Sequence, residues 1–166
     1  ALKALYYSGK VKPSLNKIIP ALEEDPKNLE LTALACEVLQ RSKDFDTLSK
    51  YADRLIKLAP QMTDGYYYKG VALQFVKGKE QEAVKNFNKA LELDPNNSIP
   101  YTNRGVLYNN LRKYDLAISD YTTAIKLDPK RPISYTNRGN SYNSIKKYHL
   151  AIIDLSKAIE LETNNI

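Results

Sequence analysis

The chain has 166 residues, with 25 Lys and Arg against 19 Asp and Glu, which gives a formal net charge of +6. Its 43% hydrophobic residues are enough for a core, and its 27% charged residues argue against a disordered or membrane-buried chain. No apolar run approaches the ~18 residues that a membrane-spanning helix needs. The single cysteine, Cys36, cannot form an internal disulfide.

Prolines recur along the chain at spacings of 34, 35 and 34 residues, at Pro26, Pro60, Pro95 and Pro129. This period is much longer than any helix or strand repeat and is the size of one helix–turn–helix unit stacked on copies of itself. It divides a single array into a partial unit at 1–28 and four units at 29–62, 63–97, 98–131 and 132–166. Because the chain lacks an initiator Met and begins within a helical pattern, we expect a fragment of a longer protein.

Each complete unit is expected to fold as two antiparallel helices. In the third complete unit, Tyr101, Gly105 and Tyr108 fall at i, i+4 and i+7 on one helical face. Gly105 and Ala124 lack bulk, so two helices can approach closely there, and Pro129 ends the second helix. We predict helices at 29–41, 45–59, 64–76, 81–93, 98–111, 115–127, 132–145 and 149–162.

These positions resemble the signature of the tetratricopeptide (TPR) repeat. That signature is an aromatic, a glycine four residues on and a tyrosine three further, then alanine, aromatic, alanine and a closing proline. The last unit matches at Tyr135, Gly139, Tyr142, Ala151, Leu155 and Ala158, and residues 63–97 match at Tyr66, Gly70, Ala83, Phe87, Ala90 and Pro95. Residues 29–62 match poorly, with Cys36 in the glycine slot. The resemblance implies an all-α fold, a right-handed α-solenoid of stacked antiparallel helix hairpins (a TPR superhelix).

Three cations stand where the family usually places a leucine, just before the glycine: Lys69, Arg104 and Arg138. We expect their aliphatic stems to pack and their charged heads to reach water or a neighbouring carboxylate. The alternative is a row of cations that serves a ligand.

The resemblance also implies a function, that of a non-catalytic adaptor or scaffold that binds an extended peptide segment of a protein partner. In TPR arrays the outward face of each first helix lines a concave groove, and in the third complete unit this face includes Thr102. The residues that we expect to contact the peptide are Tyr67, Tyr68, Phe75, Asn103, Asn110, Asn137 and Asn143. A carboxamide can pair with a peptide backbone of any sequence. Since neighbouring helices lie about 8–10 Å apart and an extended peptide advances about 3.3 Å per residue, equivalent asparagines would contact about every third peptide residue.

A clamp for the C-terminal carboxylate of heat-shock chaperones is not expected. The "YTNRG" stretches resemble a helix of such clamps, but the clamp also needs lysine and arginine where this chain has Ile133 and Asn137. The cations that would neutralise a carboxylate are missing.

A basic edge is the first alternative to the groove. The turns between paired helices contain Lys43, Lys77, Lys79, Arg112, Lys113, Lys146 and Lys147. Such an edge could meet an acidic protein, anionic lipid or nucleic acid. Lysine is common in solvated turns, and the excess charge is spread rather than concentrated, so nucleic acid is not the partner that we expect.

Self-association is the second alternative. The final predicted helix carries Ile152, Ile153, Leu155, Ile159 and Leu161, with no polar capping helix after it. Solenoids normally need such a cap for solubility, so this helix could pair with a second copy.

Nothing in the sequence indicates an enzyme. His149 occupies a turn position, and Cys36 has no histidine in its unit to activate it. There is no glycine-rich phosphate loop, no Cys/His metal spacing and no HExxH motif. We therefore expect no catalytic residue, metal site or cofactor. The compartment stays open, with the cytoplasm as the default expectation.

Overall fold

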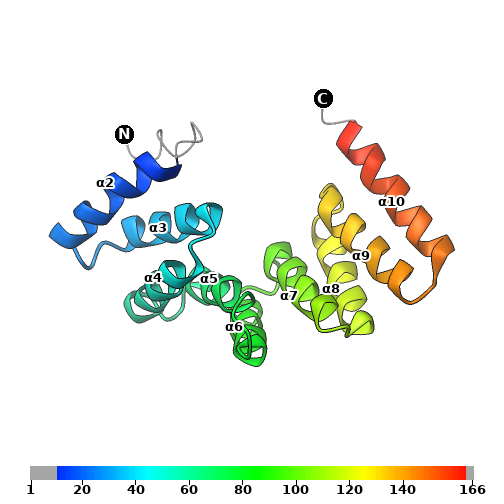
Figure 1. Cartoon of the computed structure of the whole chain (residues 1–166), viewed down its shortest axis with the longest axis horizontal. Coiled ribbons are helices and arrows are strands. Elements are labelled where there is room, and N and C mark those ends of the chain that lie inside the picture. The colour runs from blue at the N-terminus through cyan, green and yellow to red at the C-terminus, as the bar shows by residue number, and fades with distance from the viewer. Residues whose placement is uncertain (1–10, 164–166) are drawn as a thin grey trace. The chain divides into compact units, whose positions relative to one another are not determined.

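The computed structural model describes residues 11–163, which form helices without any strand (Figure 1). The helices are α2 (Val11–Glu24), α3 (Leu29–Ser42), α4 (Phe45–Leu58), α5 (Thr63–Leu73), α6 (Glu80–Leu93), α7 (Ser98–Asn110), α8 (Tyr114–Leu127), α9 (Pro132–Ser144) and α10 (Tyr148–Thr163). The predicted helix boundaries are right to within one residue, except that α5 ends at Leu73 and not at residue 76. Of the partial unit expected at 1–28, the segment before Val11 lies outside the described residues.

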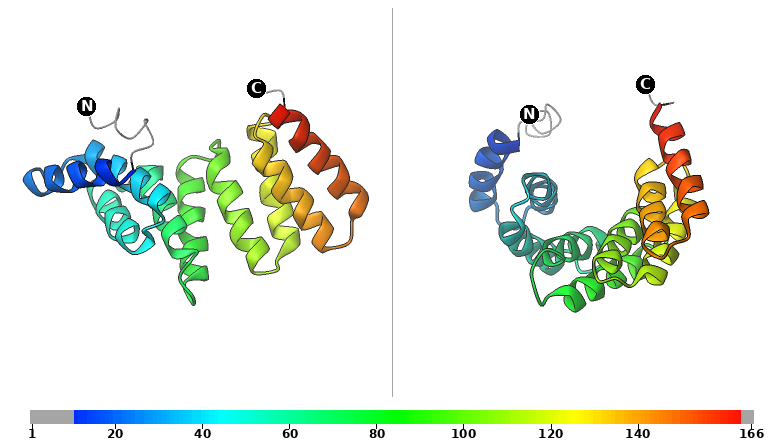
Figure 2. Two further views of the ribbon diagram at one scale, coloured as in Figure 1. Left: turned by 45° about the horizontal axis from the view of Figure 1, so that its top comes forward. Right: turned by 45° about the vertical axis from the view of Figure 1, so that its right-hand side comes forward.

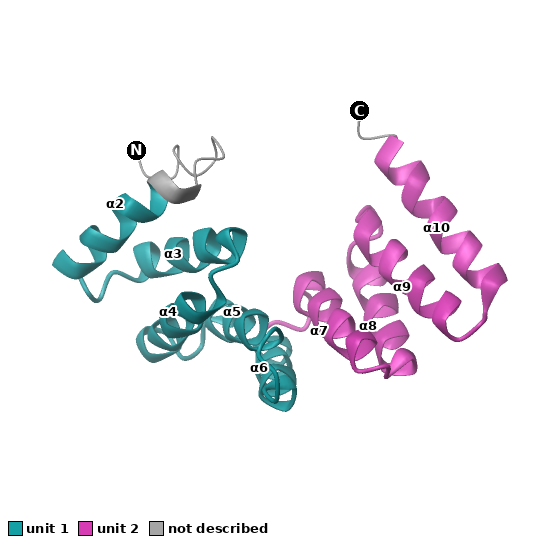
Figure 3. Ribbon diagram, in the orientation of Figure 1, with its two compact units in different colours: residues 1–93 teal, residues 94–166 magenta. Residues whose placement is uncertain are grey.

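The chain divides into two compact units, residues 1–93 and 94–166 (Figure 3). In unit 1 the helices α2 to α6 pack in chain order, and α3 also contacts α5. In unit 2 the helices α7 to α10 pack in chain order, and α7 also contacts α9 (Figure 2). The first helices of successive hairpins therefore lie side by side, α3 with α5 in unit 1 and α7 with α9 in unit 2.

Local signals in the sequence explain where the helices begin and turn. The side chains of Asn28, Asp44 and Asn97 cap α3, α4 and α7 by accepting hydrogen bonds from backbone N–H groups of the first turn. Each turn inside a hairpin contains one residue with a left-handed backbone, namely Lys43, Gly78, Arg112 and Lys146. This conformation ends the first helix and reverses the chain.

Small residues hold the two helices of a hairpin close together, as the sequence predicts. A Cβ atom placed on Gly105 would lie only 2.6 Å from the ring of Tyr121, and one on Gly70 would lie 2.8 Å from the ring of Phe87. Cys36, which stands in the glycine slot of the first complete unit, is fully buried. The prediction of close helix approach at Gly105 is confirmed.

The three cations before the glycine slot bind carboxylates, which confirms the expected packing role. Arg104 donates two hydrogen bonds to Asp120 at 2.6 and 2.8 Å, and Arg138 donates two to Asp154 at 2.7 and 2.8 Å. Lys69 donates to Asp53 on α4 at 2.7 Å. Each cation thus links two helices that are neighbours within the same compact unit.

Candidate binding faces of the first helices

In unit 1, a hydrogen bond fixes how α3 and α5 lie against each other. The amide nitrogen of Gln40 donates to the hydroxyl of Tyr67 at 2.9 Å. The rings of Tyr67 and Tyr68 lie 5.1 Å apart between centroids, and the Tyr67 ring also approaches Phe87 of α6 at 6.4 Å. The two tyrosines predicted to bind a peptide are therefore together, both half-buried. We call the surface that includes Glu37, Gln40, Asp64, Tyr67 and Tyr68 the α3–α5 face.

The α3–α5 face also carries two carboxylates, those of Glu37 and Asp64. Asp64 is half-buried in the first turn of α5, and burial raises the pKa of its carboxyl group above the ordinary value, with a further contribution from Glu37 of α3. Burial also raises the pKa of Tyr68, and the charges of Asp64 and Glu37 add to it. Two carboxylates and two phenol rings thus influence one another on a single face.

Phe75 does not lie with the two tyrosines. Because α5 ends at Leu73, Phe75 stands in the following turn, where its ring stacks on Phe45 at 4.2 Å between centroids. Phe75 is 59% exposed. It therefore forms a separate aromatic surface beside the first residue of α4.

In unit 2, pairs of small polar residues join α7 to α9. The hydroxyls of Thr102 and Ser134 lie 3.1 Å apart, and Ser141 donates to the amide oxygen of Asn109 at 2.9 Å. The expectation that Thr102 lies on the outward face is wrong, since it is only 6% exposed. Here α7 packs against its hairpin partner α8 and also against α9, which leaves a narrower free surface on α7. Both pairs are 32 residues apart in the chain, a separation set by the offset between α7 and α9 and not by the periodicity of either helix.

The asparagines predicted to bind a peptide differ in exposure. Asn110 and Asn143 are exposed near the ends of α7 and α9, whereas Asn103 and Asn137 are half-buried. The amide nitrogen of Asn103 donates to the Ile99 carbonyl of its own helix at 3.0 Å, so one of its two N–H groups is used. We call the surface that carries these four asparagines the α7–α9 face.

The cations of the hairpin turns are exposed within each unit, at Lys43, Lys77, Lys79, Arg112, Lys113, Lys146 and Lys147. In unit 2, a pocket of about 260 Å³ lies beside Arg112, Lys113 and Tyr114. The basic turns are thus accessible, as their sequence indicates.

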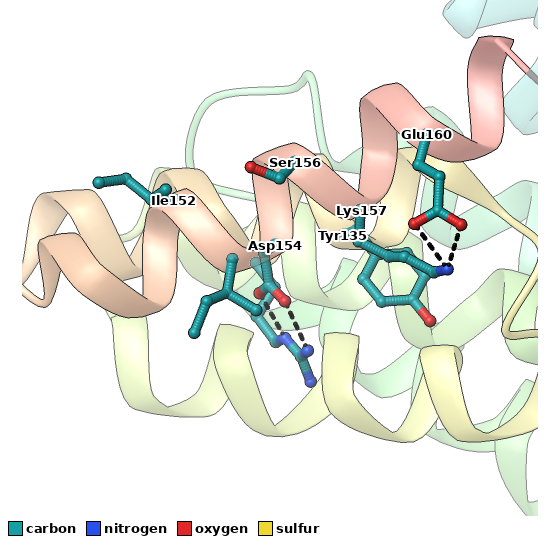
Figure 4. Close-up of a pocket in the computed structure, with 8 residues that line it drawn as sticks. Tyr135, Ile152, Asp154, Ser156, Lys157 and Glu160 are labelled. Carbon is teal, nitrogen blue, oxygen red and sulfur yellow. Dashed lines mark hydrogen bonds and ion pairs between the residues drawn. The ribbon is translucent and has the colours of Figure 1, made fainter.

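The apolar surface of α10 is also exposed. Ile152, Ile153 and Ile159 are all largely accessible. Ile152 and Ile153 line a pocket of about 510 Å³ whose wall includes Asp154, paired with Arg138 of α9 (Figure 4). This is the surface for which the sequence predicts self-association.

The groups considered for catalysis have ordinary structural environments. Cys36 lies in the core, where burial and the charge of Asp64 raise the pKa of its thiol to about 12. His149 is exposed at the start of α10. Over residues 11–163, no group of three or more His, Cys, Asp or Glu side chains is placed to hold a metal ion. No helix in that range is long and apolar enough to cross a membrane.

Comparison with known proteins identifies the repeat. The sequence model of the tetratricopeptide repeat matches residues 99–131, a second model of the same description matches residues 133–165, and a TPR repeat model matches residues 75–111. Together these matches cover more than half of the chain.

Two relatives carry similar sequences. Stress-induced-phosphoprotein 1 of Caenorhabditis elegans is 29% identical over 82 residues, which are 49% of this chain and 25% of that protein. Tetratricopeptide repeat protein 6 of Homo sapiens is 30% identical over 116 residues, which are 68% of this chain and 21% of that protein. The chain thus spans a quarter or less of the length of these relatives.

Solved structures share the fold at low identity. MamA superposes with a TM-score of 0.79 at 20% identity, over 99% of this chain and 95% of that one. A thermophilic TPR protein of Thermus thermophilus gives 0.82 at 20% identity, over 96% and 87%. YrrB, described as a TPR protein with an unusual peptide-binding site, gives 0.70 at 20% identity, over 98% and 83%. The predicted all-α TPR fold is confirmed, and the chain belongs to the tetratricopeptide repeat family, whose repeats form protein–protein interaction modules.

Proposed function

We propose that this chain binds extended segments of protein partners on its first helices, with the α3–α5 face of unit 1 and the α7–α9 face of unit 2 as two separate binding surfaces. The observation that carries the proposal is the side-by-side packing of first helices in each unit, which leaves aromatic and amide groups on their outward surfaces. YrrB, which has the same fold and a peptide-binding site by description, supports the proposal.

The chemistry of the α7–α9 face suits a peptide backbone. Asn103 donates one N–H to its own helix and keeps its second N–H and its carbonyl oxygen for a ligand. Asn137 occupies the equivalent position of α9, 34 residues later. Two amides on adjacent helices can therefore pair with peptide groups about three residues apart, independently of the partner's side chains.

The α3–α5 face contributes contact area. Tyr67 and Tyr68 offer large, rigid rings with a polar tip, a combination that is enriched where proteins meet partners. Because the Gln40 amide holds the Tyr67 hydroxyl, this ring is ordered before a partner arrives, so less side-chain entropy is lost on binding.

The test begins with a selection of displayed random 12-residue peptides on the purified chain. The affinity of the most enriched peptide is then measured by calorimetry for the chain and for the Asn103→Ala/Asn137→Ala and Tyr67→Ala/Tyr68→Ala variants. We expect the double variant of the face that holds the peptide to weaken binding about tenfold or more, while the circular-dichroism spectrum stays unchanged. A matched control, Asn96→Ala/Ser119→Ala, changes exposed polar residues away from both faces and should bind normally. Unchanged affinity in both face variants would contradict the proposal.

A further inference from the structure

The register of α3 against α5 brings two carboxylates to one place. Gln40 and Tyr67, which are hydrogen-bonded, are 27 residues apart in the chain. Glu37 and Asp64 have the same separation and lie three residues, close to one helical turn, before Gln40 and Tyr67. Equal steps of three residues along α3 and along α5, which lie side by side, keep the paired positions opposite each other. Glu37 therefore faces Asp64. The influence of Glu37 on the pKa of Asp64 agrees with this placement.

Unit 2 has different chemistry at the corresponding positions of the repeat. The residues that correspond to Glu37 and Asp64 are Val106 of α7 and Ile133 of α9, which are also 27 residues apart. The repeat fold forms there with apolar residues at both positions. The two carboxylates are a property of unit 1 and are not required by the packing of first helices.

Ionisation of Asp64 is unfavourable in the isolated chain. Burial and the neighbouring charge both oppose ionisation of Asp64, so its negative form costs folding free energy at neutral pH. Arg41 is exposed one turn beyond Glu37, and the pKa of Asp64 is raised even in its presence. A second positive group placed between Glu37 and Asp64 would relieve the repulsion.

The aromatic neighbours favour one kind of positive group. Tyr68 lies one turn after Asp64 on α5, and its phenol is influenced by both carboxylates. Its ring is in contact with that of Tyr67. A cation on an alkyl stem can bind the carboxylates with its head and pack its stem and positive edge on the rings.

We propose that Glu37 and Asp64, with Tyr67 and Tyr68, form a subsite that selects a lysine or arginine side chain of the bound segment. This inference rests on the proposed function, because it names what the α3–α5 face recognises in a partner. The expected partner segment is therefore extended, with one basic residue at a fixed position.

The experiment compares peptide selection on the chain and on the Glu37→Gln/Asp64→Asn variant. We expect peptides enriched on the chain to share a lysine or arginine at one position and peptides enriched on the variant to lose that preference. In a double-mutant cycle, replacing the basic residue of the best peptide by norleucine should weaken binding about tenfold to the chain and little to the variant. The matched control, Glu24→Gln/Glu92→Gln, removes two exposed carboxylates of unit 1 outside the face and should keep the preference.

The outcomes separate this inference from the function on which it rests. Enriched peptides without a common basic position would overturn the subsite and leave peptide binding intact. A basic preference that persists in Glu37→Gln/Asp64→Asn would overturn the assignment to these carboxylates. If no peptide is enriched on the chain, the proposed function fails and the subsite fails with it. Circular dichroism and thermal unfolding of the variant, which we expect to be at least as stable as the chain, show that it is folded.

Discussion

Arg104 and Asp120 form a two-pronged pair, with the Nε and Nη2 atoms of the arginine donating to the two carboxylate oxygens at 2.8 and 2.6 Å. The pair joins α7 to α8, and its side chains are only 18% and 8% exposed. The guanidinium also lies 5.7 and 5.9 Å from the ring centroids of Tyr101 and Tyr108. The equivalent pair, Arg138 with Asp154, joins α9 to α10. Each hairpin of unit 2 is thus held by a largely buried ion pair between two tyrosines.

The first prediction concerns this pair. Arg104→Leu restores the residue usual in TPR repeats but leaves the Asp120 carboxylate buried without its partner. We expect the free energy of unfolding, measured by urea denaturation, to fall by about 2–4 kcal/mol. Arg104→Leu/Asp120→Leu should recover much of the loss, because both charges are then gone. A control in the exposed Lys157–Glu160 pair, Lys157→Ala, should change stability by less than about 0.5 kcal/mol. A loss of similar size in the control would argue against burial as the cause.

The second prediction concerns the helix approach at glycine. Gly105→Ala places a Cβ 2.6 Å from the rigid ring of Tyr121, so the ring or the helices must move. At Gly139 the nearest atom is the flexible side chain of Leu155 at 3.0 Å. We therefore expect Gly105→Ala to lower the free energy of unfolding by about 1–3 kcal/mol, and Gly139→Ala to lower it less. Equal losses in the two variants would show that close packing on an aromatic ring is not the determinant.

The third prediction is a pH dependence at Asp64. Its pKa is raised in the folded chain, so between the unfolded and folded pKa values the folded state binds more protons, and this group destabilises the fold as pH rises. Asp64→Asn removes the penalty and should raise the melting temperature at pH 7. The gain should vanish when pH falls below the ordinary aspartate pKa of about 4, where Asp64 is protonated in both states. A gain that is independent of pH would contradict an electrostatic cause.

The fourth prediction concerns the reactivity of Cys36. Only the thiolate reacts with alkylating reagents, and the pKa of this buried thiol is raised to about 12. We expect iodoacetamide at pH 8 to modify the native chain only at the rate of unfolding, and to modify the chain in urea at once. Mass spectrometry measures both rates. Rapid modification of the native chain would place Cys36 at an accessible site.

Much of the fold follows from the sequence, because the repeat period and the glycine, alanine and proline positions determine the hairpins. The end of α5 does not, since six residues, 74–79, separate it from α6, against two or three in the other hairpins, and Gly78 reverses the chain there with a φ of 82°. Because α5 does not extend to residue 75, Phe75 does not lie on the helical face that a helical wheel of residues 64–76 predicts for it.

The binding faces are less predictable. A helical wheel gives the directions of residues on one helix, but burial of Thr102 against Ser134 depends on how two first helices are offset. The opposition of Glu37 and Asp64 depends on the same offset in unit 1, which the Gln40–Tyr67 hydrogen bond reveals. Such register between helices is not encoded in the periodicity of either helix.

The most direct test of the account is the calorimetric affinity of the best selected peptide at two salt concentrations, compared among three proteins. They are the chain, a variant of both faces with Tyr67→Ala, Tyr68→Ala, Asn103→Ala and Asn137→Ala, and a charge-reversed variant with Arg112→Glu, Lys113→Glu, Lys146→Glu and Lys147→Glu. The account predicts weaker binding in the variant of both faces, nearly normal binding after charge reversal and only a mild loss with salt, because most contacts on each face are neutral. A steep loss of affinity with salt, together with abolished binding in the charge-reversed variant, would contradict it and assign binding to the basic turns.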